Sequence, residues 1–137
     1  KMTNIKNDAI DFSESSALIS NVYIKNIGDK AVSAGENSDI EIQDVKIFES
    51  YLGVVSKDGS NVKGRNIETT NVRIPFATYI KKNEYKAPEL KVANIYYQDY
   101  KILYVKDRLS KFTINNTIQN EITNSIIEKI YNPEDRI

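Results

Sequence analysis

The sequence contains no cysteine, no histidine and no tryptophan. Without cysteine there can be no disulfide bond, no thiolate nucleophile and no cysteine-ligated metal. Without histidine the chain has no imidazole base and no histidine-ligated zinc. Any catalytic chemistry must therefore rest on lysine, arginine, tyrosine, aspartate or glutamate.

The chain also lacks a charge excess and a long apolar run. Nineteen basic and nineteen acidic residues give a net charge of zero. The bulk composition therefore favours neither nucleic acid nor an anionic membrane as a partner, and we expect neither. No apolar stretch approaches the ~20 residues of a membrane span. With 137 residues, 40% of them hydrophobic, the chain fits one globular domain.

An asparagine-type residue returns along the chain at nearly constant spacing. The positions are Asn21, Asp44, Asn66, Asn94 and Asn116, with successive intervals of 23, 22, 28 and 22 residues. A period of roughly 20 to 30 residues is typical of stacked-repeat architectures. Asparagine tolerates unusual backbone angles and hydrogen-bonds nearby backbone, so we expect these residues to form a ladder at one bend of each coil.

Apolar and polar residues alternate in short runs within each repeat, which is typical of strands buried on one face. Aligning the repeats brings apolar residues into shared columns. Three columns hold Ala17, Ile40, Val62, Leu90 and Phe112, then Ile19, Ile42, Gly64, Val92 and Ile114, then Val22, Val45, Ile67 and Ile95. Two more hold Ile10, Val32, Val54 and Leu103, then Phe12, Ala34, Ser56, Ile80 and Val105. Stacking such coils makes a continuous core.

Two stretches carry a resemblance to a known family. They read IDFSESSALISNVYIKNIGDKAVSAGENSDIEIQDVKI and GVVSKDGSNVKGRNIE. Their pattern resembles the right-handed parallel β-helix proteins of the pectate-lyase-like superfamily, closely over residues 8–72 and more loosely over 75–116. The resemblance lies in repeat style and includes no catalytic signature. It implies an all-β, right-handed parallel β-helix of four to five coils over residues 1–117, with residues 118–137 as a C-terminal cap of the same domain.

The C-terminal segment departs from the strand pattern. Its apolar residues are spaced for one face of a helix and are Ile122, Ile126, Ile127, Ile130 and Tyr131. Ser125 and Glu128 match a capping box, and Asn132-Pro133 ends the segment. We expect this helix to cover one end of the coil stack, because an open end exposes apolar side chains and unpaired strand edges.

The other end of the stack, near Lys1, has no such cover in the sequence. We expect the chain to be a segment of a longer protein. The N-terminal coil end would then pack on an upstream domain, or on a second copy of the chain in a homo-oligomer.

One turn of the aligned repeats gathers charged residues. The alignment places Lys57, Lys81 and Lys106 in one column, beside an acidic row that includes Asp58 and Asp107. This arrangement predicts a binding strip for an anionic polysaccharide. Lyases of similar fold use a lysine or arginine base with carboxylates that often hold calcium, and Lys57 beside Lys81 would have the lowered pKa that such a base needs. The competing interpretation is solvated turn residues whose charges pair across coils.

Tyrosines could add stacking surfaces for sugar rings. Tyr79 and Tyr104 fall in one outward column of the alignment, although they would equally serve to cover coil edges or the insertion at residues 83–88. The full candidate ligand-binding set is Lys57, Asp58, Lys81, Lys106, Tyr79 and Tyr104. Glu36, Asp58 and Asp107 lack the spacing of an EF-hand, so we expect no metal site and no cofactor.

Two functional hypotheses follow. The first is a noncatalytic β-helix module of a larger bacterial surface or secreted protein, structural or carbohydrate-associated, located outside the cell or at its surface. The missing histidine and the lack of an acid–base constellation support it. The alternative is the C-terminal part of a polysaccharide lyase or epimerase acting on an anionic glycan. Self-association through the N-terminal coil end is a third reading.

Overall fold

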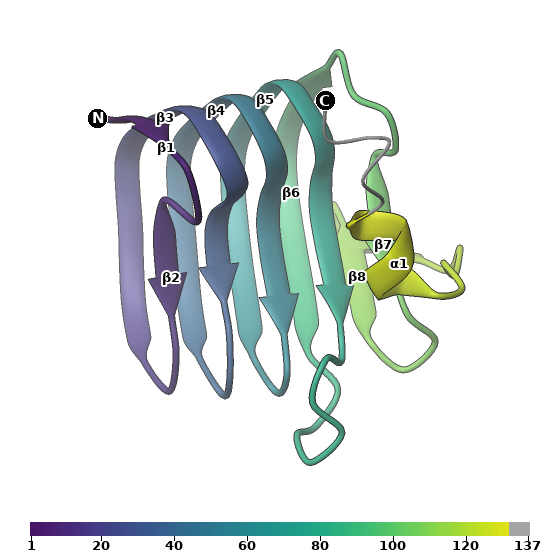
Figure 1. Cartoon of the computed structure of the whole chain (residues 1–137). Helices are drawn as coiled ribbons and strands as arrows, with labels where there is room; N and C mark the ends of the chain where they lie inside the picture. Colours follow the sequence, from purple (N-terminus) through teal and green to yellow (C-terminus); the bar gives the residue numbers. More distant parts are fainter. Residues whose placement is uncertain (132–137) are drawn as a thin grey trace.

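The computed structural model describes residues 1–131 and is an all-β parallel solenoid of about five turns (Figure 1). The strands are β1 (Met2–Ile5), β2 (Ile10–Phe12), β3 (Ser16–Ala34), β4 (Asp39–Lys57), β5 (Asn61–Tyr79), β6 (Glu89–Gln98), β7 (Tyr104–Lys106), β8 (Lys111–Ile114) and β9 (Thr117–Gln119). One short helix, α1, spans Ile126–Ile130. The predicted β-solenoid is therefore confirmed.

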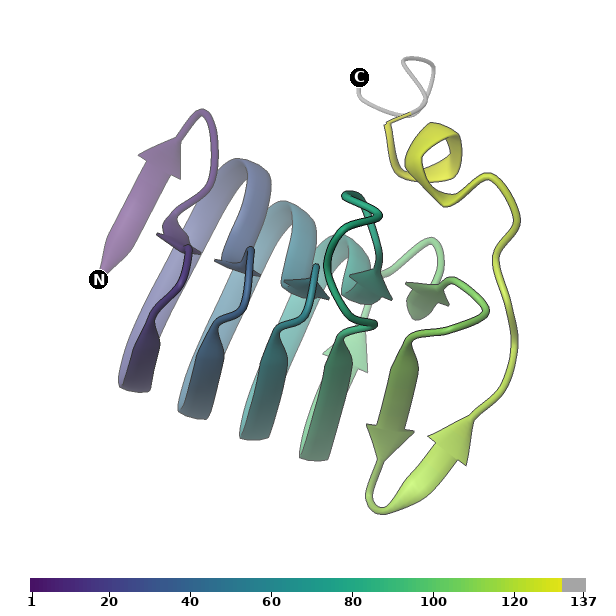
Figure 2. The same cartoon turned by 90° about the horizontal axis from the view of Figure 1, so that it is seen from below.

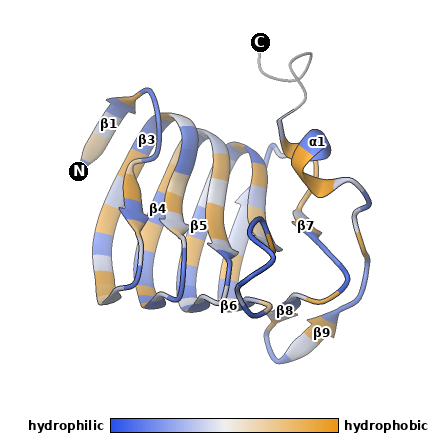
Figure 3. Ribbon diagram, turned by 60° about the horizontal axis from the view of Figure 1, so that its bottom comes forward, coloured by the Kyte–Doolittle hydropathy of each residue, from blue (hydrophilic) through white to orange (hydrophobic). Residues whose placement is uncertain are grey.

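The strands stack in parallel register, as Figure 2 shows from below. On β3 to β8 the first-strand residues pair as Ala17, Ile40, Val62, Leu90 and Phe112. The next two predicted columns, beginning at Ile19 and Val22, are also in register. Because side chains alternate between faces, these columns point into the coil and form its core. Alternation of orange and blue along each strand in Figure 3 follows the same pattern.

Asparagine-type residues make the first bend of each coil. Asn21, Asp44, Asn66 and Asn94 have positive φ angles between 52° and 56°, a conformation that these short polar side chains tolerate best after glycine. The Asn66 side-chain amide donates to Asp44 Oδ1 at 2.9 Å. Asn116 differs, because Asn115 and Asn116 turn the chain back into an antiparallel β8–β9 hairpin instead of another coil.

A second left-handed bend follows five residues after the first. Its residues are Asn4, Asn26, Glu49, Asn71 and Asp99, with φ between 55° and 60°. The Asn26 amide donates to Asn4 Oδ1 at 2.8 Å. The two bends divide each coil into a first side (residues 16–20 and their equivalents), a second side (22–25) and a third side (27–34). The sequence analysis missed this bend, although its residues recur at intervals of 22, 23, 22 and 28.

The predicted columns of the third side are wrong in the fourth and fifth repeats. Val54 pairs with Phe76, and Phe76 pairs with Tyr104 and not with a column containing Leu103. Likewise Ser56 is followed by Thr78 and Lys106, not by Ile80 and Val105. Tyr104 follows Phe76 by 28 residues, whereas Phe76 follows Val54 by 22. All six extra residues lie in the loop of residues 80–88 between β5 and β6, and the alignment had spread them along the repeat.

The core of the coil is apolar along its whole length and becomes aromatic toward its C-terminal end. Val32, Val54 and Phe76 from the third side meet the first-side columns inside the coil. The rings of Phe76 and Phe112 lie 5.7 Å apart, and those of Tyr104 and Phe112 lie 4.9 Å apart. Large rings thus fill the last coils, where no further rung follows β8 in parallel.

The predicted C-terminal helix is present, but it lies on the flank of the solenoid. Ile126 and Ile130 pack with Leu52 and Ile74 on the outer surface of the third side. The predicted capping box is absent, since Ser125 has a left-handed φ of 52° and its side chain makes no cap bond. The helix is too short to project Ile122 onto the same face, and Asn132-Pro133 lies outside the described residues. No helix within residues 1–131 is long and apolar enough to cross a membrane.

Side chains from the solenoid hold the end of α1 in place. The Arg73 guanidinium donates to the carbonyl oxygens of Ile130, at 3.1 Å, and Lys129, at 3.2 Å. The Tyr51 hydroxyl donates to the Ile130 oxygen as well. These donors satisfy carbonyls that a helix C-terminus leaves without partners, and a cation there also suits the helix dipole.

Carboxylates anchor the 80–88 loop to the neighbouring turns. Asp58 Oδ1 accepts the backbone N–H groups of Lys81 and Lys82 at 2.6 and 2.8 Å. Glu36 accepts a bond from the Ser13 hydroxyl at 2.7 Å and pairs with the Lys82 amine at 3.0 Å. The Ser13 hydroxyl first, and Lys82 second, lower the pKa of Glu36 to about 2.

Replacing Val54 by aspartate should unfold the domain. Val54 is fully buried between Val32 and Phe76, and an unpaired charge there costs several kcal/mol, comparable with the whole stability of a small domain. Circular dichroism with urea titration measures the loss. Lys81→Asp, at an exposed loop position, is the control and should unfold near the parent midpoint. A folded Val54→Asp variant of parental stability would contradict the inward register of the third side.

Replacing Glu36 by glutamine should weaken the domain slightly at neutral pH and not at all near pH 2. A folded pKa of about 2, below the ordinary 4.5, means that the Glu36 contribution is complete above pH 4.5 and disappears as the pH falls toward 2. Urea midpoints measured at several pH values test this. Glu41→Gln, on the exposed first side, controls for the loss of charge. Parent and Glu36→Gln curves that stay parallel from pH 7 to pH 2 would refute it.

Candidate functional site

Buried charged groups gather on the outer surface of the third side. Lys30 is only 5% exposed, Asp58 is fully buried, and Tyr79 is 1% exposed. Charged side chains are almost never buried so deeply unless they are paired. The strands of the solenoid hold these groups at fixed positions, and sites built on strands are more precise than sites built on loops.

Lys30 is compensated by acidic neighbours. Its amine lies 3.3 Å from Asp29 Oδ2 and 3.8 Å from Asp8 Oδ1, and 5.4 Å from the centre of the Tyr131 ring. Burial is the largest influence on the Lys30 pKa and lowers it, but the combined effect of Tyr131 and the two carboxylates leaves the pKa raised. Burial in turn raises the pKa of Asp8. Lys30 therefore forms part of a satisfied charge network.

Tyr79 and Tyr131 close one edge of this network. The Tyr131 hydroxyl donates to Asp29 Oδ1 at 3.4 Å, and the two tyrosine hydroxyls also interact with each other. Burial, the main cause, raises the pKa of both and raises that of Tyr79 strongly. Both phenols are therefore neutral at physiological pH. They serve as hydrogen-bonding groups and not as bases.

Lys57 stands out because it has no such compensation. It pairs in register with Tyr79 and is half-buried, yet within residues 1–131 its amine has no hydrogen-bond or ion-pair partner. Burial lowers the pKa of Lys57, and the nearby charges of Lys30 and Lys81 lower it further, whereas Asp58 and Asp11 act in the opposite direction. A half-buried amine without an acidic contact is a recognised sign of a functional position.

Two further polar atoms near Lys57 also lack partners. Ser33 Oγ and Asp58 Oδ2 are buried and make no hydrogen bond. Ser33 pairs in register with Val55, which precedes Lys57 by two residues, so Ser33 and Lys57 face the same side of the sheet. Unsatisfied buried polar atoms require an explanation, and a bound ion, water or ligand is one. We call Lys30, Ser33, Lys57, Asp58 and Tyr79 the Lys57 cluster.

The structure brings together only part of the predicted binding strip. Lys57, Asp58 and Tyr79 lie close together, and Lys81 is exposed in the adjacent loop. Lys106 is buried at the end of the third side, and its amine donates to the Asp107 carbonyl at 2.7 Å. The predicted lysine column is wrong, because Lys57 pairs with Tyr79 and Lys106 pairs with Thr78.

The predicted tyrosine column is wrong as well. Tyr104 pairs with Phe76, stacks on Phe112, and accepts the Glu121 backbone N–H on its hydroxyl at 3.1 Å. Tyr79 lies on the outer surface three residues after Phe76. The two rings therefore belong to different faces of the third side and cannot form one stacking platform.

Sequence reasoning missed Lys30, Ser33 and Tyr131. A signal for Lys30 was present, because its register equivalents are Leu52 and Ile74, and a lysine in an apolar column is unusual. Tyr131 had no such signal, since it reaches Lys30 from the far end of the chain. Within residues 1–131 no three acidic side chains lie close enough to hold a metal ion, and Asp58 and Glu36 are instead engaged with the 80–88 loop.

No protein-family model matches this chain, and neither does any curated protein or solved structure. The β-solenoid is therefore established by the structure itself. Membership of the pectate-lyase-like superfamily stays a prediction of the repeat pattern.

Proposed function

We propose that the chain is a noncatalytic, carbohydrate-associated β-solenoid module that binds an acidic glycan, with one sugar carboxylate held at the Lys57 cluster. The observation that carries this proposal is the half-buried Lys57 amine, which has no acidic partner among the described residues. Lys30 is already paired with Asp29 and Asp8. The positive charge of Lys57 is thus the one in the cluster left for an incoming anion.

A carboxylate at Lys57 would gain from its surroundings. Hydrogen bonds between an ammonium and a carboxylate are about twice as strong as neutral ones. They are screened less at a half-buried position than at the open surface. The Ser33 hydroxyl, buried and without a partner, supplies a further donor. Lys81 adds positive charge from the exposed loop.

Nearby acidic groups limit what the site would accept. Asp58 and Asp11 lie close enough to influence the Lys57 pKa, and they would repel additional negative charge. A ligand with one carboxylate on a neutral sugar ring therefore suits the site better than a group with dense charge, such as a phosphate. Sugars of this kind occur in acidic polysaccharides of cell surfaces and cell walls, which agrees with the expected location of the chain.

Replacing Lys57 by methionine should weaken binding of a short uronic acid oligosaccharide at least about tenfold, because a charge-assisted hydrogen bond is lost while the aliphatic stem is kept. Isothermal titration calorimetry with galacturonate oligomers measures this. Lys25→Met, on the exposed second side, should bind like the parent. The proposal fails if the parent does not bind the oligomers, or if Lys57→Met binds them equally well.

A second candidate function is the lyase or epimerase reaction, which the lowered pKa of Lys57 favours. In a lyase the neutral amine would take the proton from the carbon next to the sugar carboxylate. The released electron pair would form a carbon–carbon double bond as the bond to the leaving oxygen breaks, and that oxygen would take a proton from water.

The two functions predict opposite pH responses. Anion binding requires a protonated Lys57, so affinity should fall as the pH rises through its lowered pKa, whereas elimination requires the neutral amine and should rise over the same range. Ultraviolet absorbance of unsaturated products, with polygalacturonate and alginate as substrates, measures elimination. We expect none from the parent at any pH. Product that forms in the parent and is absent in Lys57→Met would establish the enzyme instead.

A further inference from the structure

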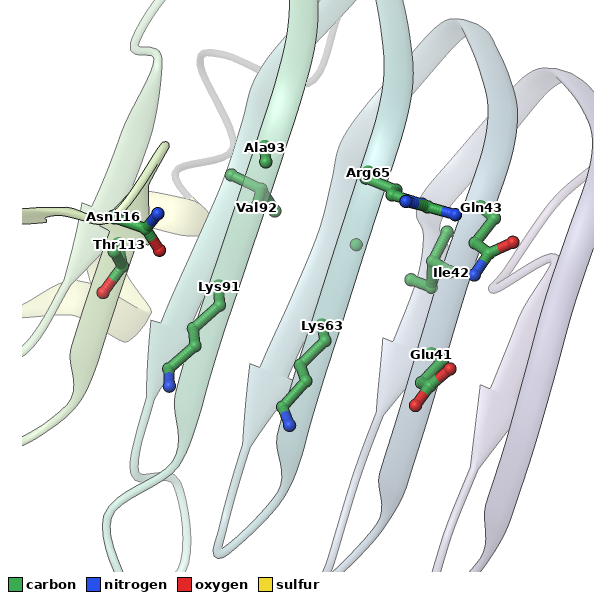
Figure 4. A pocket seen from close by; sticks show the side chains of 11 residues that line it. Glu41, Ile42, Gln43, Lys63, Arg65, Lys91, Val92, Ala93, Thr113 and Asn116 are labelled. Carbon is green, nitrogen blue, oxygen red and sulfur yellow. The ribbon is translucent and has the colours of Figure 1, made fainter.

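The outer surface of the first side carries a shallow groove that the Lys57 cluster does not involve. The groove has a volume of about 320 Å³ and crosses the strands β4, β5, β6 and β8 (Figure 4). Its polar lining residues are Glu41, Gln43, Lys63, Arg65, Lys91, Thr113 and Asn116. Glu41, Lys63, Arg65 and Lys91 are all exposed. The helix α1 covers the third side and leaves this surface open.

Three cations on neighbouring strands dominate the groove. Lys63 and Lys91 are direct register partners on β5 and β6, and Figure 4 shows their side chains running in the same direction. Arg65 follows Lys63 by two residues and so lies on the same face. Like charges placed opposite each other on adjacent strands repel and lower stability. In a chain with zero net charge, this local concentration of positive charge stands out.

Local acids do little to neutralise these cations. Lys91 lies 4.0 Å from Glu89, at the limit of an ion pair. Within residues 1–131, Lys63 and Arg65 have no ion-pair partner. The Arg65 side chain extends toward the neutral Gln43 in Figure 4. An external anion would therefore relieve the repulsion between Lys63 and Lys91.

We propose that this groove is a second binding surface, for a linear acidic polysaccharide that lies across the strands along the axis of the solenoid. Adjacent strands are about 4.8 Å apart, so the solenoid repeats its cations at a short, regular spacing. A polymer with a carboxylate or sulfate on each sugar repeats its charges in a comparable way. Gln43, Thr113 and Asn116 provide hydrogen-bonding groups for the hydroxyls between them.

The surface suits a polysaccharide better than a nucleic acid. Its cations are interleaved with Glu41 and Glu89 on the same side of the coil, which would repel a densely charged phosphate backbone. The outward residues of the described first side include no aromatic ring on which bases could stack. Because it shares no residue with the Lys57 cluster, this inference does not depend on the function proposed above.

Reversing the charge of Lys63 and Lys91 together should weaken binding of long acidic polymers at least about tenfold. The probes are polygalacturonate and dextran sulfate, with uncharged dextran as a negative control, measured by affinity electrophoresis at several salt concentrations. Binding by the parent should weaken as salt rises, because exposed ion pairs are screened. The matched control is Lys25→Glu with Lys46→Glu, which makes the same change in net charge on the second side.

The outcomes separate the surface from general charge effects and from the Lys57 cluster. Circular dichroism first establishes that both double variants are folded. Lys57→Met should bind the polymers like the parent, and Lys63→Glu with Lys91→Glu should still bind short oligomers at the Lys57 cluster. An equal loss in the Lys25→Glu, Lys46→Glu control would overturn the inference. So would absence of polymer binding by the parent, or tighter binding of double-stranded RNA than of either polysaccharide.

Discussion

The parallel register between successive coils is the constraint on which every other feature depends. Side chains alternate between the two faces of a strand, so a slip of one residue would turn the core column from Ala17 to Phe112 outward. The left-handed bends at Asn21 and its equivalents fix where each strand changes direction. Hydrogen bonds between stacked side chains, such as Asn66 to Asp44, tie neighbouring bends together. Register thus places each outward residue one strand spacing from its equivalent.

That regular placement gives the third side two different halves. Leu52, Ile74 and their neighbours form an apolar half that α1 covers. Lys30 replaces this apolar column in the preceding coil, and with Lys57 and Tyr79 it creates a polar half beside the helix. The first side has no comparable cover, so its charged residues stay in water. The same scaffold can therefore hold one carboxylate in a half-buried setting and present a row of cations on an open surface.

Much of the fold could be predicted from the sequence, because its signals are local and periodic. The columns beginning at Ala17, Ile19 and Val22 follow from alternation and a constant repeat length. Prediction failed where length was not constant, since nothing in the sequence says where the six extra residues of the fourth repeat lie. That error misplaced Lys106 and Tyr104, and with them half of the predicted binding strip. The position of α1 and the contact of Tyr131 with Lys30 depend on tertiary packing between distant segments, which periodicity does not encode.

The loop of residues 80–88 carries a further implication for how such a chain can change. It adds length at one corner, yet the strands on either side keep the register of the shorter repeats. Asp58 grips the start of the loop through the backbone of Lys81 and Lys82, so the grip depends little on which side chains the loop carries. That corner is accordingly a natural grafting point, where a foreign peptide could be displayed without disturbing the stack beneath it.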